Sequence, residues 1–184
     1  MHKVLLVIGD AAEITDTLYP YYRIAEDGYE VHMAGPEKRQ YHLVQHDKHP
    51  DWDITVESKG YNWNTDIAFA QVNEEEYLGL VLSGGRAPEY IRYDEDLMRI
   101  TRHFGETGKP IAVVCHGIEI VAKAGVIKGK RVTTVAKCAY DAEVCGATYV
   151  DEPCVVDGNL ITARFPYDLP RLIRAMVEQL AVAR

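Results

Sequence analysis

The sequence predicts an α/β fold, in which helices cover a largely parallel sheet, and two features of the 184-residue chain indicate it. Short apolar runs alternate with amphipathic stretches along nearly the whole length. The runs KVLLVI (residues 3–8) and PIAVVC (residues 110–115) are continuously apolar, as expected of strands covered on both faces. This alternation is typical of an α/β sandwich, and we expect residues 1–184 to form one domain.

The first elements form a β-α-β unit. After the strand at residues 3–8, residues 14–26 place apolar side chains at helical spacing, and Gly28 ends the helix. Pro20 is expected to kink this helix or to mark where its regular part begins. The alternating run YEVHMAG (residues 29–35) then predicts a second strand, reached by a right-handed crossover.

The remaining elements continue the alternation after an irregular middle segment. Residues 36–66 are polar and aromatic, which predicts short strands or an excursion from the main sheet. EYLGLVLSGG predicts a strand that ends in a glycine turn, and DEDLMRITRHFGETG and IEIVAKAG predict helices on either side of PIAVVC. CVVDGNLITA holds the hairpin signal Asp157-Gly158. LPRLIRAMVEQLAVA closes the chain as a helix, with Pro170 in its first turn.

Charge and composition narrow the classes of partner. The net charge of −8 argues against a nucleic-acid backbone or an anionic membrane surface, and favours a small neutral ligand or a partner protein. The sequence has no apolar run of about 18 residues. The opening MHKVLLVIGDAAE turns acidic too early for a secretory signal, so we expect a cytoplasmic protein.

The four cysteines, Cys115, Cys138, Cys145 and Cys154, lack the spacing of a zinc motif. We therefore expect reduced thiols rather than a disulfide framework. Cys138 and Cys145 flank a short helical piece and are predicted to be structural.

The tripeptide Cys115-His116-Gly117 joins a predicted strand to a predicted helix. In open α/β sheets, ligands bind beyond the carboxyl ends of the strands. Gly117 allows a tight turn, and the helix N-terminus carries roughly half a positive charge, which favours thiolate over thiol at Cys115. The corner is therefore predicted to present an exposed, activated nucleophile, as a nucleophile elbow does. A small buried cysteine beside a chance histidine is the alternative.

Several motifs occur in a familiar order: LSGGRAPEY, GKPIAVVCHG, AGVIKGKRVTT and VVDGNLITA. Together they resemble the DJ-1/PfpI (ThiJ/PfpI) superfamily over nearly the whole chain, most strongly between Val72 and Ala163. WDITVESKGYNWNTDIAFAQVNEEEY is most similar to plant DJ-1 homologues with glyoxalase activity and their bacterial relatives. The resemblance implies a flavodoxin-like three-layer sandwich, like that of class I glutamine amidotransferases, which assembles as a homodimer or as a hexamer built from dimers.

The resemblance also implies roles for particular residues. The reactive cysteine of the family matches Cys115, with His116 beside it. In the PfpI-type branch, the glutamate of the GGRAPE loop, here Glu89, orients that histidine from a neighbouring subunit. Alignment on TLYP puts Asp16 where the family usually has a glutamate beside the cysteine, and Glu13 matches a second acidic position. Aspartate is shorter by one bond of about 1.5 Å. Some relatives with aspartate there hydrate isocyanides, so this residue leaves the reaction open.

The glycine turns supply candidates for an oxyanion hole. The backbone amides of Gly84, Gly85 and His116 could lie roughly 3 Å from a developing negative charge, and Gly117 belongs to the same region. An ordinary tight turn explains the glycines equally well. Ser83 stands where many relatives have proline, and we expect its effect to be mild. The resemblance implies no cofactor and no resident metal.

Three histidines in the middle segment, His42, His46 and His49, raise the question of a metal site. His42 and His46 could share a zinc ion if they lay one turn apart on a helix. Pro50, several charges and weak apolar periodicity favour a solvated loop instead. One imidazole could still reach substrate at the mouth of the pocket.

Three functions follow as hypotheses. The first is a cofactor-independent cysteine enzyme for reactive carbonyls, in which Cys115 attacks methylglyoxal or glyoxal, or a glycated protein or nucleotide. Asp16 or Glu13, with His116, would then move protons to give a hydroxy acid. The second is an intracellular cysteine peptidase or amidase, with His116 as base. The third is a non-enzymatic redox sensor or chaperone-like stress protein, since a low-pKa thiol oxidises readily.

Overall fold

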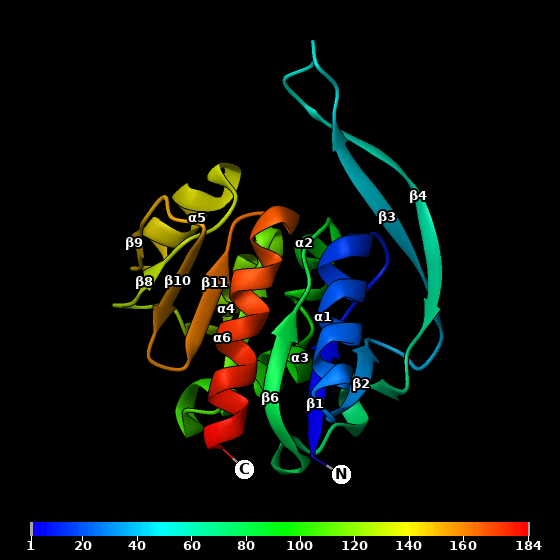
Figure 1. The fold of residues 1–184 in the computed structure, drawn as a ribbon, viewed down its shortest axis with the longest axis vertical. Helices are drawn as coiled ribbons and strands as arrows, with labels where there is room; N and C mark the ends of the chain where they lie inside the picture. The colour runs from blue at the N-terminus through cyan, green and yellow to red at the C-terminus, as the bar shows by residue number, and fades with distance from the viewer. Residues whose placement is uncertain (1, 184) are drawn as a thin grey trace.

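The fold is a layered α/β sandwich, seen in a computed structural model that describes residues 2–183. A seven-stranded sheet of order β10-β11-β7-β6-β1-β2-β5 lies between helices α1 and α6 on one face and α3 and α4 on the other (Figure 1). Within this sheet β10 runs antiparallel to its neighbour β11, and the other pairings are parallel. The predicted flavodoxin-like architecture with a mainly parallel sheet is confirmed.

The strands of this main sheet are β1 Lys3–Val7, β2 Glu30–Gly35, β5 Ile67–Ala68, β6 Tyr77–Leu82, β7 Ile111–Val114, β10 Cys154–Asp157 and β11 Leu160–Ala163. Two further two-stranded sheets are formed by β3 Gln40–Lys48 with β4 Thr55–Asn64, and by β8 Arg131–Val132 with β9 Thr148–Tyr149. The helices are α1 Ile14–Glu26, α2 Ala87–Ile91, α3 Glu95–Thr107, α4 Ile118–Ala124, α5 Ala139–Val144 and α6 Leu169–Val182.

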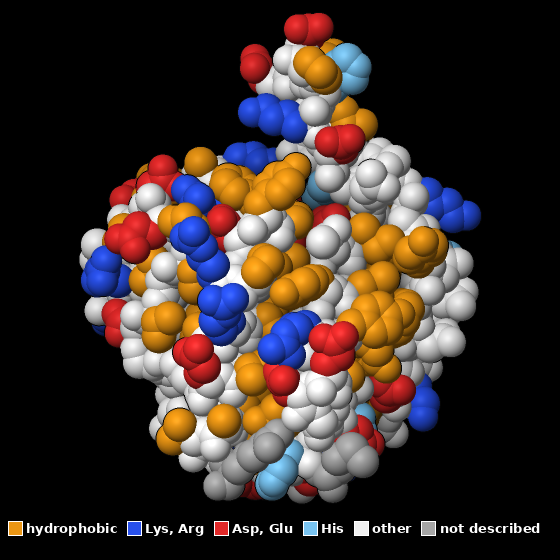
Figure 2. Space-filling model, in the orientation of Figure 1, with side chains coloured by type: hydrophobic (Ala, Val, Ile, Leu, Met, Phe, Trp, Pro, Cys, Tyr) orange, Lys and Arg blue, Asp and Glu red, His pale blue; other side chains and the backbone are white. Residues whose placement is uncertain are grey.

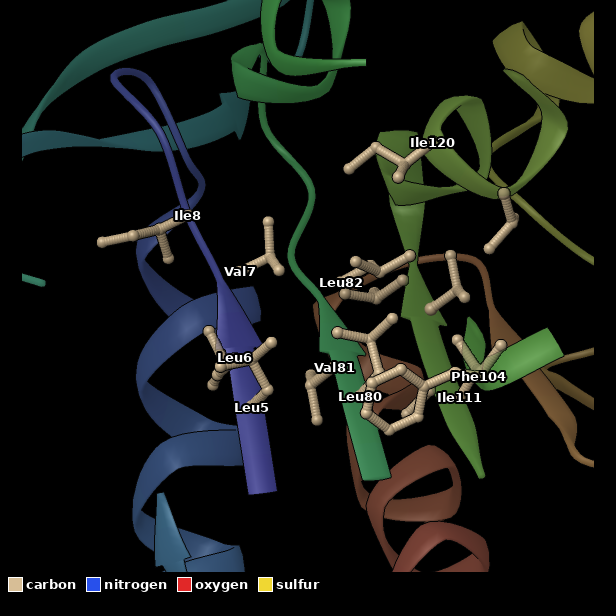
Figure 3. Packing of buried hydrophobic residues seen from close by; sticks show 14 of the residues in the cluster. Leu5, Leu6, Val7, Ile8, Leu80, Val81, Leu82, Phe104, Ile111 and Ile120 are labelled. Atoms are coloured by element: carbon tan, nitrogen blue, oxygen red, sulfur yellow. The ribbon is translucent and has the colours of Figure 1, made fainter. Parts of the chain in front are cut away.

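The central strands are buried on both faces, which is why their sequences are continuously apolar. Leu5 and Leu6 of β1 and Leu80 of β6 have no exposed surface. Figure 3 shows them beside one another, with Phe104 of α3 and Ile111 of β7 completing the same cluster. Each large apolar side chain buried in this way stabilises the fold by roughly 1.5–3 kcal/mol. The strands therefore form a rigid support for the loops at their carboxyl ends.

Helix α1 begins at Ile14 and continues through Pro20 to Glu26. The alternative in which Pro20 marks the start of the regular helix is therefore wrong. Proline lacks the N–H that would bond to the carbonyl of Asp16, one turn earlier, so the helix continues with one backbone hydrogen bond fewer. The first turn, which holds Asp16, is fixed instead by side-chain bonds.

The middle segment contains a long β-hairpin, β3–β4, which projects from the body of the molecule (Figure 1). Figure 2 shows acidic, basic, histidine and apolar side chains mixed at its tip. The base of the hairpin is anchored in the core: Tyr41 and Leu43 of β3 are buried, and Trp63 of β4 packs against the core. The predicted solvated loop around His42 and His46 is thus wrong. The structure also rules out their helical zinc pair, because four residues along a strand span about 13 Å.

Among residues 2–183, no helix combines the length and apolar character needed to cross a membrane.

Candidate active site

Cys115 occupies the corner between β7 and a single 3₁₀ turn, Cys115–Gly117, which leads directly into α4. Its φ angle is +54°, in the left-handed region that non-glycine residues rarely adopt. Such a conformation costs on the order of 1–3 kcal/mol and persists only where the surroundings enforce it. Thr134 contributes by donating its hydroxyl to the carbonyl of Cys115 at 2.8 Å. The cysteine thus lies at the strand-to-helix corner that the sequence predicts, and its backbone there is strained.

The groups around the sulfur shift its pKa in opposite directions. The backbone amides of Gly85 and His116 face Cys115 Sγ and favour the thiolate. Burial and then the nearby Asp16 carboxylate act in the opposite direction and outweigh them, so the pKa of the Cys115 thiol is raised. The expectation that the helix dipole activates Cys115 stays a prediction, and within the single chain burial and Asp16 act against it. The dipole acts on a sulfur that is half-buried beside another acid rather than open to water.

Asp16 lies in the first turn of α1 and has no exposed surface. Its carboxyl group and the Cys115 side chain flank Gly84: a methyl group on Gly84 would collide with Asp16 Oδ2 and approach Cys115 Cβ to 2.7 Å. Neither carboxyl oxygen of Asp16 has a hydrogen-bond partner among residues 2–183. Burial and the neighbouring charge of Glu13 raise the pKa of Asp16 well above its ordinary value. Asp16 is therefore an acid that resists ionisation next to the sulfur.

Glu13 supports Asp16 rather than the sulfur. It is the N-cap of α1, and its Oε2 accepts a hydrogen bond from the backbone N–H of Asp16 at 2.7 Å. Burial raises the pKa of the Glu13 carboxyl. One residue further into the helix, the hydroxyl of Thr17 bonds to that of Ser83 at 2.8 Å, which ties α1 to the glycine loop after β6. Serine thus has a specific partner at the position where many relatives have proline.

The candidate oxyanion donors separate into two groups. The amides of Gly85 and His116 face the sulfur, whereas the amide of Gly84 faces Asp16 and favours its charged form. Gly117 has a packing role, because a methyl group there would approach the carbonyl oxygen of Leu82 to 2.7 Å. Gly85 and His116 are therefore the two amides of this set that are placed to stabilise charge at the reacting centre.

His116 connects the elbow to an open cleft. Its Nδ1 lies 3.3 Å from Cys115 Sγ. Burial, followed by the positive charges of Lys137 and His46, lowers the pKa of His116 to about 4. The imidazole is consequently neutral at physiological pH and can accept a proton. The cleft has a volume of about 430 Å³. Its lining residues are Glu89, Tyr90, Arg92, His116, Glu119, Lys137, Cys138 and Asp141.

Glu89 belongs to α2 and lines the same cleft as His116 within one chain. The structure thus brings together Cys115, His116, Asp16 and Glu13 around the elbow and places Glu89 in the lining of the cleft. The expectation that Glu89 acts on the histidine of a neighbouring subunit stays a prediction.

The hairpin is fixed beside the site by a network that the sequence analysis missed. Arg86 donates two hydrogen bonds, from Nε and Nη2, to the carboxylate of Glu57, each at 2.7 Å. His46 Nε2 lies 3.0 Å from the same carboxylate. The Arg86 guanidinium is the main cause that lowers the pKa of Glu57 to about 2. The pair links β4 to the glycine loop, and His46 is the one of the three histidines that this network holds. No local sequence motif indicates this network. It depends on how β3 and β4 pair, which places His46 opposite Glu57.

Gly85 gives a direct test of how tightly the loops are joined at the site. Gly85→Ala is expected to destabilise the chain by about 3 kcal/mol or more, because the new methyl group would collide with the backbone at Ala11 and Glu13. Gly28→Ala is the matched control: its φ of +83° is close to the +81° of Gly85, but nothing lies within 4 Å of the added atom. There we expect only the conformational cost, roughly 1 kcal/mol. If urea denaturation showed the same loss of unfolding free energy for Gly85→Ala and Gly28→Ala, the close packing of Gly85 against the backbone at Ala11 and Glu13 would be contradicted.

The family follows from comparison with known proteins. The sequence model of the DJ-1/PfpI family matches residues 2–179. The chain belongs to the DJ-1/PfpI family. Deglycase PfpI of Pyrococcus furiosus is 37% identical over 178 residues, which cover 97% of this chain and 99% of that protein. Protein DJ-1 homolog D of Arabidopsis thaliana is 33% identical over 183 residues, 96% of this chain and 47% of that protein.

The structure of a two-domain protein with DJ-1/ThiJ/PfpI-like and ferritin-like domains, from Anabaena variabilis, superposes with a TM-score of 0.83 and 29% identity. The match covers 97% of this chain and 50% of that protein. Membership of the DJ-1/PfpI family, and the likeness to both the PfpI-type branch and the plant homologues, are therefore confirmed.

Proposed function

We propose that this DJ-1/PfpI protein is a cofactor-independent cysteine enzyme that acts on reactive carbonyl compounds, as a deglycase or as a glyoxalase that converts methylglyoxal to lactate. One observation carries the proposal: Cys115 Sγ lies 3.3 Å from His116 Nδ1, and the buried carboxyl group of Asp16, whose pKa is raised, flanks Gly84 together with the Cys115 side chain. The relative from Pyrococcus furiosus is named a deglycase, which supports the same class of activity.

The first step requires a base and an acid beside the sulfur. His116 takes the thiol proton while the sulfur attacks the aldehyde carbon of methylglyoxal, because the raised pKa of the thiol and the lowered pKa of His116 disfavour a free thiolate before the attack. Asp16 gives its proton to the new alkoxide, so that the product is a hemithioacetal and Asp16 becomes a carboxylate. The amides of Gly85 and His116 stabilise the negative charge while it develops.

The second step moves hydrogen between the two substrate carbons. The Asp16 carboxylate removes the proton from the carbon bonded to sulfur, which gives an enediolate. The hydroxyl proton on that carbon passes to the oxygen of the adjacent carbonyl group, and Asp16 returns its proton to the adjacent carbon, which leaves a thioester of lactate. Water then cleaves the thioester: its hydroxyl group goes to the acyl carbon and its proton to Asp16, while His116 returns its proton to the sulfur, so that lactic acid, which ionises to lactate, and the Cys115 thiol are released. A glycated amine enters the same sequence when the thiolate displaces the amine from its carbonyl adduct.

The proposal assigns Glu89 a supporting role. It orients His116 from a neighbouring copy of the chain in a homo-oligomer. Beside it, Tyr90 and Tyr93 are 67% and 62% exposed, as expected of side chains that an assembly would cover.

The activity is tested by a substrate panel on the purified wild-type chain. We expect methylglyoxal to be consumed and lactate to appear, measured by carbonyl derivatisation and a lactate assay, with heat-denatured protein as the control. A fluorogenic peptide and an aromatic isocyanide are assayed in parallel. Peptide hydrolysis without carbonyl turnover would support the peptidase alternative. Isocyanide hydration without carbonyl turnover would indicate that the protein, with Asp16 beside the cysteine, is an isocyanide hydratase. Either result contradicts the proposal.

A further inference from the structure

A second group of chemically active side chains lies in the cleft, one helical turn beyond the elbow. His116, Glu119 and Cys138 each offer one ligand atom, and these three atoms lie within 4.8 Å of one another. His116 and Glu119 come from the chain entering α4, three residues apart and so on one side of the helix. Cys138 comes from the 3₁₀ turn Ala136–Cys138 before α5 and is 2% exposed.

The donor set and its spacing suit one particular ion. A thiolate, an imidazole and a carboxylate are the ligands that Zn²⁺ takes, whereas hard cations such as Mg²⁺ prefer oxygen alone. Bonds of about 2.0–2.3 Å at tetrahedral angles put neighbouring donors roughly 3.3–3.8 Å apart. Cys138 Sγ and Glu119 Oε1 are already 3.7 Å apart. The three donors therefore need only a small closing movement to share a zinc ion.

Arg92 prepares the carboxylate for this role. Its Nη1 donates to Glu119 Oε2 at 3.0 Å, and the other oxygen, Oε1, is the one that faces Cys138. Hydrogen bonds of this kind orient the ligands in zinc sites. The cleft gives a metal ion access from solvent. The carboxylates of Glu89 and Asp141 on its wall attract a cation, and the side chains of Arg92 and Lys137 oppose this attraction.

We propose that His116, Glu119 and Cys138 form a Zn²⁺ site, with water from the cleft as the fourth ligand. As the Zn–S bond forms, the Cys138 thiol loses its proton to solvent. When His116 binds zinc, the lone pair of its basic nitrogen forms the bond to the metal, so the imidazole can no longer accept the proton of Cys115. Zinc binding at this site therefore inhibits the enzyme. That consequence rests on the proposed function, whereas the binding itself does not.

The site is tested by metal binding alone. The wild-type chain, reduced and in its native oligomeric state, is titrated with Zn²⁺ against a chromogenic chelator, and with Co²⁺ to record the absorption band of a thiolate–cobalt bond. We expect Cys138→Ser and Glu119→Gln each to weaken zinc binding at least about tenfold, and Cys138→Ser to abolish the cobalt band.

Two other cysteines are the controls. Cys145→Ser, at an exposed position, and Cys115→Ser, at the elbow, are expected to keep wild-type zinc affinity and the cobalt band. Loss of binding in Cys115→Ser with retention in Cys138→Ser would overturn the proposal, because the ion would then use the elbow sulfur. Should Cys138→Ser not fold, the wild-type chain still decides: a cobalt complex without a thiolate band overturns it as well.

Inhibition is measured separately. Carbonyl turnover of each variant is compared with its own metal-free rate, and Zn²⁺ is expected to inhibit the wild type at concentrations at least about tenfold below those needed for Cys138→Ser. Zinc that binds through Cys138 without slowing a measurable turnover would overturn the inhibitory role. A chain without any turnover leaves the binding test intact, so the failure of the proposed function and the failure of the zinc site are distinguishable.

Discussion

Cys115→Ser is expected to lower methylglyoxal turnover by at least about 10³-fold while the chain keeps its fold, because an unactivated hydroxyl is a far weaker nucleophile than a thiolate. Serine is close to cysteine in size, so the side chain still fits between Asp16 and the amide of Gly85. The measurements are steady-state lactate production, and far-ultraviolet circular dichroism with thermal unfolding to establish that the structure is intact.

The matched control is Cys145→Ser, which changes a thiol that is exposed after α5. Its turnover is expected to equal that of the wild type, which separates loss of the elbow sulfur from a general effect of removing a thiol. A folded Cys115→Ser variant that turns over methylglyoxal within about tenfold of wild type would exclude covalent cysteine catalysis.

The main sheet was predictable because strands that are buried on both faces consist of consecutive apolar residues. A strand such as β1, covered on both faces, has to be apolar at every position, and Val4 to Val7 are. Helices α1, α3 and α6 each bury one side, so their apolar residues recur at helical spacing. The order of the motifs then predicted the family. The position of the elbow could be predicted from the strand and helix patterns and from the family motif, since only the short turn Cys115–Gly117 separates β7 from α4.

The hairpin was not predictable in the same way. The alternation that indicates a half-buried sheet is confined to the start of β3, where Tyr41 and Leu43 are buried between exposed residues, and most other side chains of the hairpin are exposed. Pairing between β3 and β4 and the bidentate bond from Arg86 to Glu57 hold it instead. Both are contacts between distant parts of the sequence, which a local pattern does not record.

The charge of the site escaped prediction for a related reason. The helix dipole at Cys115 is a local feature and can be inferred from the strand–helix junction. Burial of the sulfur, and then the approach of Asp16 from α1, raise the pKa of the thiol, and both depend on how α1 meets the loop after β6. Cys138 meets Glu119 through a tertiary contact as well. Of the three proposed zinc ligands, only His116 and Glu119 are close in the sequence, three residues apart.

Asp16→Asn is expected to reduce turnover by about 10²-fold or more and, at the same time, to make the chain more stable. The amide of asparagine can donate a hydrogen bond but cannot give a proton to the alkoxide or take one from carbon. Turnover is measured as lactate production. Stability rises because a neutral amide of the same shape replaces an acid that has no hydrogen-bond partner among residues 2–183 and that resists ionisation.

The direction of the pH dependence distinguishes this account from simple loss of packing. The pKa of Asp16 is raised in the folded chain, so the unfolded chain loses its proton first and gains stability relative to the folded one as pH rises above about 4. The stability contribution of the protonated Asp16 is therefore complete below that pH and is lost as pH rises through the folded pKa. Asp16→Asn should match the wild type near pH 4 and exceed it increasingly towards neutrality, measured as melting temperature.

Glu26→Gln is the control, since it makes the same acid-to-amide change at an exposed position at the other end of α1. Its melting temperature should follow that of the wild type at every pH. An Asp16→Asn variant that is less stable than wild type at neutral pH would mean that the carboxylate is charged and stabilised in the folded chain. Asp16 would then have no proton to give to the alkoxide, and the first step of the proposed reaction would need another acid.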